Sequence, residues 1–456
     1  MENSFNLLLI TNSNVSSGAG VIARDFREAF LKHKIDTRVL VNQFSGDSDY
    51  IYNVQTESQS RKINIIRAVI RNKIFNKIFN KIITIAANIF KVSNGLVFKT
   101  LNSNKYFIQD IEQTKEIYSS DKLYKKVVDF KPDAMILLFP QNFITYKNIY
   151  ELSRKWGNIP VFITLLDMAP ITGGCHYTWD CLGYMNECSN CPAVTSKYKS
   201  KLINNLEFKS FYADKGAFNF VYSSDYLMGI IKKATISAKN NHYKIPLPTN
   251  EEYYHNNLSK RSKYRNELGV DEPDVLLFFG AMDLLNPRKG GKYLKEAISK
   301  ILQDKDITNI KFLVVGNNFN EFEEIIPKNQ LRTLDIIPPR ELPNYYNAAD
   351  IFLSTSIEDA GPMMVNQSLM CGTRVCAFEV GVALDMIKSN TDCGRCAESI
   401  TSNSLYKIIK EEILNQQNND RKLLRKKCAD SAFSMTSKSE VSRKWIEIIK
   451  EVRNNR

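Results

Sequence analysis

The chain has 456 residues, of which 43% are hydrophobic and 24% charged, values typical of a globular protein that is too long for one core. Disordered and fibrous classes are excluded, and no stretch approaches the run of about 20 apolar residues that a membrane span requires. Lys and Arg number 62 against 49 Asp and Glu, which gives a formal charge of +13. Nucleic acids, anionic lipids and anionic substrates all attract positive charge. The position of the positive charges along the chain therefore has to distinguish between these partners.

The first forty residues predict the start of a parallel α/β fold. An apolar run over 5–10 precedes a Ser/Gly-rich loop with Gly18 and Gly20, then helical spacing over 21–34 and a strand over 37–41. This is a βαβ unit of the Rossmann type, and glycines at its first turn let backbone N–H groups approach a diphosphate or a sugar. Because no basic region precedes the apolar run, we expect a buried strand rather than an export signal, and a cytoplasmic protein.

A basic segment follows at 61–109. It holds ten Lys or Arg residues, and no acidic residue lies between Glu57 and Asp110. A Lys-Ile-Phe-Asn repeat over 73–80 predicts a helix with Lys and Asn on one side and Ile and Phe on the other. We expect this helix to lie on an anionic membrane surface, where each lysine contributes about 1 kcal/mol. The alternative is an ordinary surface helix whose apolar side packs on the protein.

The segment 172–192 is rich in cysteine. Its cysteines, with spacing C-x5-C-x6-C-x2-C, are Cys175, Cys181, Cys188 and Cys191. In a cytoplasmic chain, thiolates at short spacings predict a structural zinc site, although this spacing is not a standard one and buried free thiols are an equal alternative.

The second half again alternates strands and helices. Strands are expected at 275–279, 311–315, 335–337, 351–354 and 374–378, with a break between the halves near 246–250. We therefore predict two Rossmann-like domains facing each other across a cleft, at 1–248 and 262–435, and a final helix at 436–456.

Two loops of the second half carry the clearest ligand-binding pattern. Arg288 and Lys289 directly precede a helix, as a clamp for a diphosphate would. About 70 residues later, Glu358 and the Ala-Gly-Pro-Met sequence that follows Asp359 again connect a strand to a helix. A carboxylate there can accept hydrogen bonds from sugar hydroxyls, while amides after Gly361 face a phosphate.

The order of these motifs, followed by Cys371-Gly372-Thr373, resembles the retaining glycosyltransferases of the GT-B fold, group 1 (family 4 type). The resemblance extends over both halves and implies that Arg288 and Lys289 hold the donor diphosphate and that Glu358 addresses the donor sugar. Gly361, Met363 and Gln367 would also contact the donor.

The chain departs from the family pattern at two places. The second carboxylate of the family's E-x7-E element is replaced by Asn366 or, in another alignment, by Gln367. Leu166 stands where the family commonly has His, which leaves Asp167 and His176 as the polar candidates near the reacting centre. The Gly-Gly-Cys-His-Tyr and Cys-x-x-Cys-Pro sequences resemble an insertion that a polysaccharide-biosynthesis subset carries near the acceptor side.

The resemblance implies transfer of a sugar from a nucleotide-diphosphate-sugar to a lipid-linked glycan of a cell-surface polysaccharide or O-antigen, on the inner face of the cytoplasmic membrane. The mechanism would be retaining, need no cofactor, and use Glu358, Lys289, Arg288 and Asp167. Alternatives are an inactive GT-B subunit that supports an assembly, a nucleotide-sugar epimerase and a phosphorylase. Nucleic acid is not expected as a partner, because the basic segment lacks aromatic residues spaced for base stacking.

Overall fold

The computed structural model describes residues 5–12, 20–44, 48–55, 105–108 and 112–455. Gly18 and the predicted amphipathic helix within 61–109 lie outside the described residues. In the described part of the chain, no helix combines the length and the hydropathy needed to cross a membrane.

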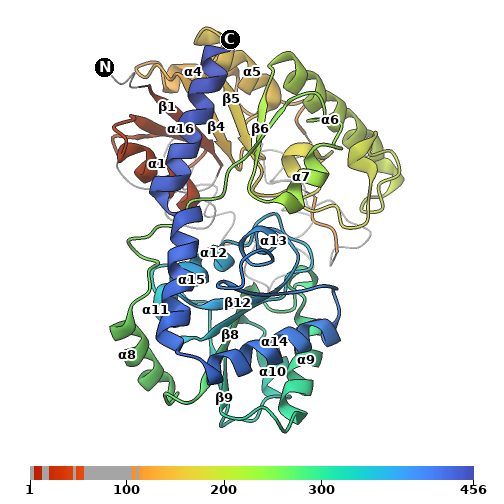
Figure 1. Cartoon of the computed structure of the whole chain (residues 1–456). Coiled ribbons are helices and arrows are strands. Elements are labelled where there is room, and N and C mark those ends of the chain that lie inside the picture. The colour runs from red at the N-terminus through yellow and green to blue at the C-terminus, as the bar shows by residue number, and fades with distance from the viewer. Residues whose placement is uncertain (1–4, 13–19, 45–47, 56–104, 109–111, 456) are drawn as a thin grey trace, which may run out of the picture.

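Two parallel sheets form the centres of two domains, which Figure 1 shows one above the other. The first sheet has the strand order β3-β2-β1-β4-β5-β6-β7 and the second has the order β10-β9-β8-β11-β12-β13, and every strand pair is parallel. The strands of the first sheet are β1 (Leu7–Thr11), β2 (Thr37–Val41), β3 (Ile51–Asn53), β4 (Ala134–Leu138), β5 (Val161–Thr164), β6 (Asn219–Tyr222) and β7 (Asn241–Lys244). Those of the second are β8 (Val275–Asp283), β9 (Ile310–Asn317), β10 (Leu331–Leu334), β11 (Ile351–Ser354), β12 (Arg374–Phe378) and β13 (Gly394–Ala397).

Helices cover both faces of each sheet. Those of the N-terminal domain are α1 (Gly20–Leu31), α4 (Ser120–Lys126), α5 (Tyr146–Lys155), α6 (Ser196–Lys215) and α7 (Asp225–Ile231). The others are α8 (Leu258–Leu268), α9 (Gly291–Gln303), α10 (Asn320–Glu323), α11 (Leu342–Ala348), α12 (Met363–Met370), α13 (Ala383–Met386), α14 (Ser402–Asn418), α15 (Arg421–Thr436) and α16 (Lys438–Asn454). One apolar cluster lies on each face of each sheet. In the first sheet, α1 and α16 cover one face and α4 to α7 cover the other. In the second sheet, α9 and α14 cover one face, and α8, α11, α12 and α15 cover the other.

The central strands are continuous apolar runs because helices cover them on both sides. All five residues of β1 and all five of β4 are buried. The strand predicted at 335–337 is wrong: β10 ends at Leu334 and pairs with β9. Two prolines, Pro338 and Pro339, follow closely and cannot donate to a strand ladder, so the pairing ends earlier.

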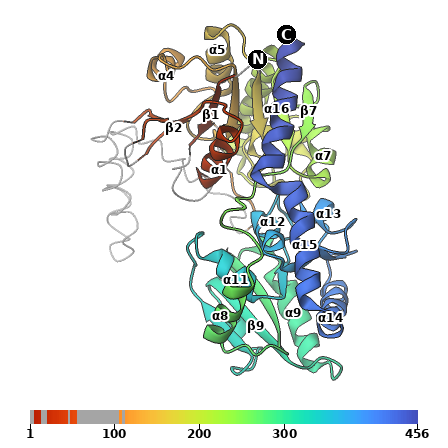
Figure 2. The ribbon, with the colours of Figure 1, turned by 60° about the vertical axis from the view of Figure 1, so that its left-hand side comes forward.

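The last helix returns to the first domain. From α15, which packs on the second domain, the chain continues into α16 beside α1 (Figures 1 and 2). Trp445 is 1% exposed, and its ring centroid lies 5.7 Å from that of Phe26 and 5.6 Å from that of Phe162. Near the end of α16, Arg453 Nη2 donates to Asp133 Oδ1 at 2.8 Å. The chain therefore crosses between the domains twice.

Candidate functional site

The candidate site lies where loops at the carboxyl ends of strands from both sheets meet. Arg288 and Lys289 lie in a short 3-10 turn after β8, and Glu358 and Asp359 follow β11, the neighbour of β8 in the sheet. From the N-terminal domain, Asp167 follows β5. Ligands of open parallel sheets bind at this edge, because the connecting loops and the N-termini of the following helices converge there.

The two loops of the C-terminal domain are joined to each other by hydrogen bonds. Thr355 Oγ1 donates to the backbone oxygen of Lys289 at 2.7 Å, and the N–H of Ile357 donates to that of Arg288 at 2.8 Å. Gly290, at φ 66°, allows this approach, because a Cβ atom there would lie 2.0 Å from the carbonyl oxygen of Thr355. The positions of Arg288 and Lys289 are thus fixed relative to the loop after β11.

One buried carboxylate holds both cations. Lys289 Nζ lies 2.8 Å from Asp359 Oδ2, and Arg288 Nη1 lies 3.5 Å from the same oxygen and donates to the Glu358 backbone oxygen at 2.9 Å. Burial acts to raise the pKa of Asp359, but Lys289 and Arg288 outweigh it, so this pKa lies below its usual value. Asp359 therefore remains ionised. The prediction missed it, although its place directly after Glu358 was a signal.

Glu358 extends between the two domains. Its Oε1 accepts a hydrogen bond from the N–H of Trp179 and its Oε2 accepts one from the Tyr226 hydroxyl, both at 3.4 Å. Burial raises the pKa of Glu358 despite these donors and Arg288, and the charge of Asp180 adds to the rise. Burial, followed by the charge of Glu358, also raises the pKa of Tyr226. The carboxylate predicted to address a sugar thus lies at the boundary of the two domains.

Aromatic and backbone contacts complete this boundary. The guanidinium carbon of Arg288 lies 4.1 Å from the ring centroid of Tyr177, a cation–π distance. Ser223 Oγ donates to the backbone oxygen of Ala360 at 3.4 Å, and a Cβ on Gly361 would lie 2.8 Å from that hydroxyl. Gly361 is therefore placed against the N-terminal domain. No sequence pattern pointed to Tyr226, whereas Tyr177 belongs to the Gly-Gly-Cys-His-Tyr motif.

Asp167 and His176 contact each other. Asp167 is fully buried, and its Oδ1 accepts from Gln141 Nε2 at 3.1 Å and from the N–H of Ala169 at 2.8 Å. Its Oδ2 lies 2.8 Å from His176 Nδ1, and the His176 ring packs edge-on against Tyr177 at 4.4 Å between centroids. The structure thus brings the two predicted polar candidates together. The buried Asp167 fits a positioning role, and His176 contacts Tyr177, the ring against which Arg288 packs.

The other predicted donor residues are spread over two helices. Gly20 is the buried first residue of α1, at the carboxyl end of β1. Met363 begins α12, but its side chain packs against an apolar cluster of the N-terminal domain. Asn366 and Gln367 are adjacent on α12 and point about 100° apart around its axis. Asn366 is 1% exposed and lines a cavity of about 410 Å³ between the domains, and its Oδ1 has no hydrogen-bond partner among the residues that the structure describes, whereas Gln367 is half-buried.

The four cysteines of the segment 172–192 lie in one neighbourhood. Cys175 and Cys191 are hydrogen-bonded through their thiols, and both lie within electrostatic range of Cys188. Backbone N–H groups donate to the sulfurs of Cys181 and Cys191 at 3.4 Å. However, no three His, Cys, Asp or Glu side chains within the described residues are grouped as metal ligands. The thiols as placed do not form a tetrahedral zinc site, and zinc stays a prediction.

Residues 260–432 match the family "Glycosyl transferases group 1". The D-inositol 3-phosphate glycosyltransferase of Corynebacterium efficiens is 30% identical over 128 residues, which are 26% of this chain and 30% of that protein, so the similarity spans less than a third of the curated relative.

Solved structures match over nearly the whole chain. A glycosyltransferase from Rickettsia africae has a TM-score of 0.62 at 14% identity and covers 100% of both chains. Anabaena Alr3699/HepE in complex with UDP-glucose has a TM-score of 0.57 at 14% identity, with 98% of this chain and 100% of that chain covered. These likenesses show the fold, and the prediction of a GT-B architecture with two Rossmann-like domains is confirmed. The family match supports a group 1 glycosyltransferase.

Proposed function

We propose that the protein is a retaining glycosyltransferase that transfers a sugar from a nucleotide-diphosphate-sugar to a glycan acceptor. The observation that carries this proposal is the convergence of Arg288, Lys289 and Glu358 in two loops that are hydrogen-bonded to each other at the carboxyl edge of a parallel sheet. The matched family and the UDP-glucose bound by the Anabaena neighbour support the same donor class.

Arg288 and Lys289 are positioned to stabilise the negative charge of the departing diphosphate. As the bond between the anomeric carbon and the diphosphate breaks, negative charge grows on the phosphate oxygens, and preorganised cations and helix N-termini stabilise it. Arg288 and Lys289 lie directly before α9, and α12 begins four residues after Asp359, so both N-termini lie in this region. Glu358 would accept hydrogen bonds from hydroxyls of the donor sugar, in place of those from Trp179 and Tyr226.

We propose that the configuration of the anomeric carbon is retained without a covalent bond between the sugar and an enzyme nucleophile. Asp167 is fully buried and has three hydrogen-bond partners on its two oxygens, so it is not placed to bond covalently to a sugar. We therefore propose that the acceptor hydroxyl attacks on the face from which the nucleotide leaves, and that no metal or other cofactor is required. His176, oriented by Asp167, would contact the donor sugar or the acceptor.

We further propose that the acceptor is a lipid-linked glycan of a cell-surface polysaccharide or O-antigen, and that the protein binds the inner face of the cytoplasmic membrane. The support is the sequence pattern of 61–109, where ten cations and an apolar stripe match what an anionic lipid surface would bind.

The proposed function is tested by donor turnover. Purified protein is incubated with a panel of nucleotide sugars, led by UDP-sugars, and release of the nucleoside diphosphate is measured with and without lipid-linked acceptors. We expect turnover in the wild type, loss of at least 100-fold in Arg288→Ala/Lys289→Ala, and little change in Lys292→Ala, an exposed lysine on α9. Tight nucleotide binding without turnover on any acceptor would instead identify an inactive subunit, and interconversion of sugars without acceptor would identify an epimerase.

A further inference from the structure

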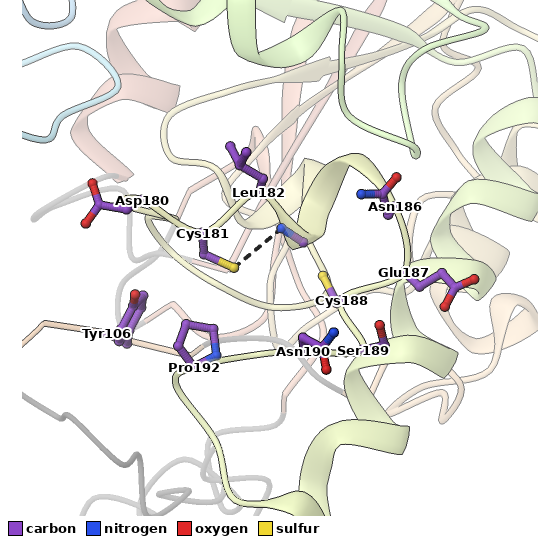
Figure 3. Close-up of a pocket in the computed structure, with 11 residues that line it drawn as sticks. Tyr106, Asp180, Cys181, Leu182, Asn186, Glu187, Cys188, Ser189, Asn190 and Pro192 are labelled. Carbon is purple, nitrogen blue, oxygen red and sulfur yellow. Dashed lines mark hydrogen bonds between the residues drawn. The ribbon is translucent and has the colours of Figure 1, made fainter.

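A second hollow lies on the N-terminal domain beside Glu358. It has a volume of about 490 Å³, within the range of about 300–1,000 Å³ usual for small-molecule sites. Figure 3 shows Tyr106 and Pro192 at one end of it and Asn186 and Glu187 at the other, with the loop that bears Cys181 between them.

The pocket is built by the segment 172–192 together with residues 105–108. Ile108 forms an antiparallel bridge with Cys175, and the N–H of His176 donates to the backbone oxygen of Phe107 at 2.9 Å. Trp179 Nε1 donates to the backbone oxygen of Lys105 at 2.5 Å. These contacts hold Tyr106 against the cysteine-bearing loop and give the pocket one aromatic wall.

The lining offers apolar surface and uncharged polar groups together. The Tyr106 ring, Pro192 and the 62% exposed Leu182 provide the apolar part. Asn186, Ser189 and Asn190 provide amide and hydroxyl groups that both donate and accept hydrogen bonds. A sugar ring presents the matching surface, with C–H groups on its faces and hydroxyls around its edge.

The charge of the lining restricts the ligand. Among the described residues that line the pocket, the charged ones are Asp180 and Glu187, and none is a Lys or Arg. Lys105 Nζ lies 2.8 Å from Asp180 Oδ2, so that carboxylate is partly neutralised, while Glu187 is exposed. A phosphate or a uronic acid would meet like charge here, whereas a neutral or amine-bearing sugar would not.

The pocket lies next to the candidate site. Asp180 directly follows Trp179, whose N–H donates to Glu358 Oε1, and Glu358 lies within electrostatic range of Asp180 and Tyr184. Resting on the proposed function, in which Glu358 holds the donor sugar, we propose that this pocket is a subsite for an uncharged or amine-bearing sugar residue of the acceptor. The segment 172–192 would then select acceptors according to the charge of their sugar residues.

The test uses full-length protein and three saccharide probes. Chitotriose, maltotriose and tri-galacturonate are each added at about 10 mM, tenfold above a dissociation constant of 1 mM, and followed by saturation-transfer difference NMR. We expect signal from at least one neutral probe and at least fivefold less from tri-galacturonate. Asn190→Trp, at an exposed lining position, should fill the pocket and reduce the signal at least tenfold, while Asn204→Trp, at an exposed position of α6 outside the lining, should leave it unchanged.

Nucleotide binding separates this proposal from the proposed function. Asn190→Trp should bind UDP with wild-type affinity, because it leaves the Arg288–Lys289 loop intact. Glycan binding that Asn190→Trp removes, in a protein that binds no nucleotide, would support the pocket and contradict the transferase. Equal signals from Asn190→Trp and wild type, preferential binding of tri-galacturonate, or no binding of either neutral probe would overturn the subsite, whatever the donor assays show.

Discussion

Replacement of Lys289 by alanine should weaken the binding of a nucleoside diphosphate about 10- to 150-fold. A hydrogen bond from a charged group contributes about 1.5–3 kcal/mol, and each 1.4 kcal/mol is a factor of ten. Lys289 Nζ already lies 2.8 Å from Asp359 Oδ2, so little ordering is needed when the ligand binds. The Lys289 side chain is 27% exposed and has to share its charge with Asp359, so we expect the lower half of this range.

A substitution of Asp359 can show why Lys289→Ala loses affinity for the diphosphate. Burial favours a higher pKa for Asp359, and Lys289 is the strongest of the groups that lower it, so the pKa should rise in Lys289→Ala. To the extent that Asp359 stays ionised in this variant, its carboxylate would repel the diphosphate. The double variant Lys289→Ala/Asp359→Asn removes this repulsion, and we expect it to recover part of the lost affinity but not all.

Isothermal titration with the nucleoside diphosphate that gives the largest thermal shift in the wild type measures these differences. Lys292→Ala serves as the control for loss of a nearby positive charge. An affinity of Lys289→Ala within about threefold of the wild type would refute a direct contact with the diphosphate. Full recovery in the double variant would show that Lys289 acts only by neutralising Asp359.

Three further expectations concern stability, membrane binding and metal. Burial favours a higher pKa for Asp350, but Arg261, whose Nη2 lies 2.6 Å from Asp350 Oδ1, lowers it to about 2 together with Arg265 and Arg421. The stabilising effect of the ionised Asp350 is therefore complete above pH 3.8 and is lost as the pH falls through about 2. Asp350→Asn should therefore lower the free energy of unfolding by about 3–5 kcal/mol at pH 7, and urea titrations should show this difference shrinking below pH 4. Substitution of Lys73, Lys77 and Lys81 by Glu should release the protein from vesicles that contain anionic lipid, and unchanged sedimentation would favour the ordinary surface helix. Elemental analysis decides between zinc and free thiols in the segment 172–192: one zinc per chain would require the four thiols to lie closer together than in this structure, whereas less than about half an equivalent would support free thiols.

The sequence pattern predicted the fold because the fold depends on local periodicity. Buried parallel strands are continuous apolar runs, and β1 and β8 were recognisable for that reason. Short strands of mixed character were harder: β10 was expected several residues too late, and β7, with exposed ends and a half-buried centre, carried no apolar run.

The candidate site was predictable only where its residues share a loop. Arg288, Lys289 and Glu358 belong to two local motifs, and the structure joins those loops through hydrogen bonds. Contacts between the domains, such as that of Tyr226 with Glu358, depend on how two separately folded sheets are oriented, and no local pattern encodes that. The contact between Asp167 and His176 is harder to predict than a local motif and easier than a contact between domains. The two residues are nine positions apart, and the loop between them has to reverse its direction.

The return of α16 to the first domain has a consequence for synthesis on the ribosome. The first sheet is complete at Lys244, yet Trp445 and its neighbours on α16 form part of the apolar cluster on one face of that sheet. At about 5–20 residues per second, the intervening 200 or so residues take roughly 10–40 s to translate. During that interval the nascent N-terminal domain exposes the apolar surface of Phe26 and Phe162 that Trp445 later covers. Chaperone occupancy of stalled nascent chains should therefore persist after the second domain has emerged and end only when residue 454 leaves the exit tunnel.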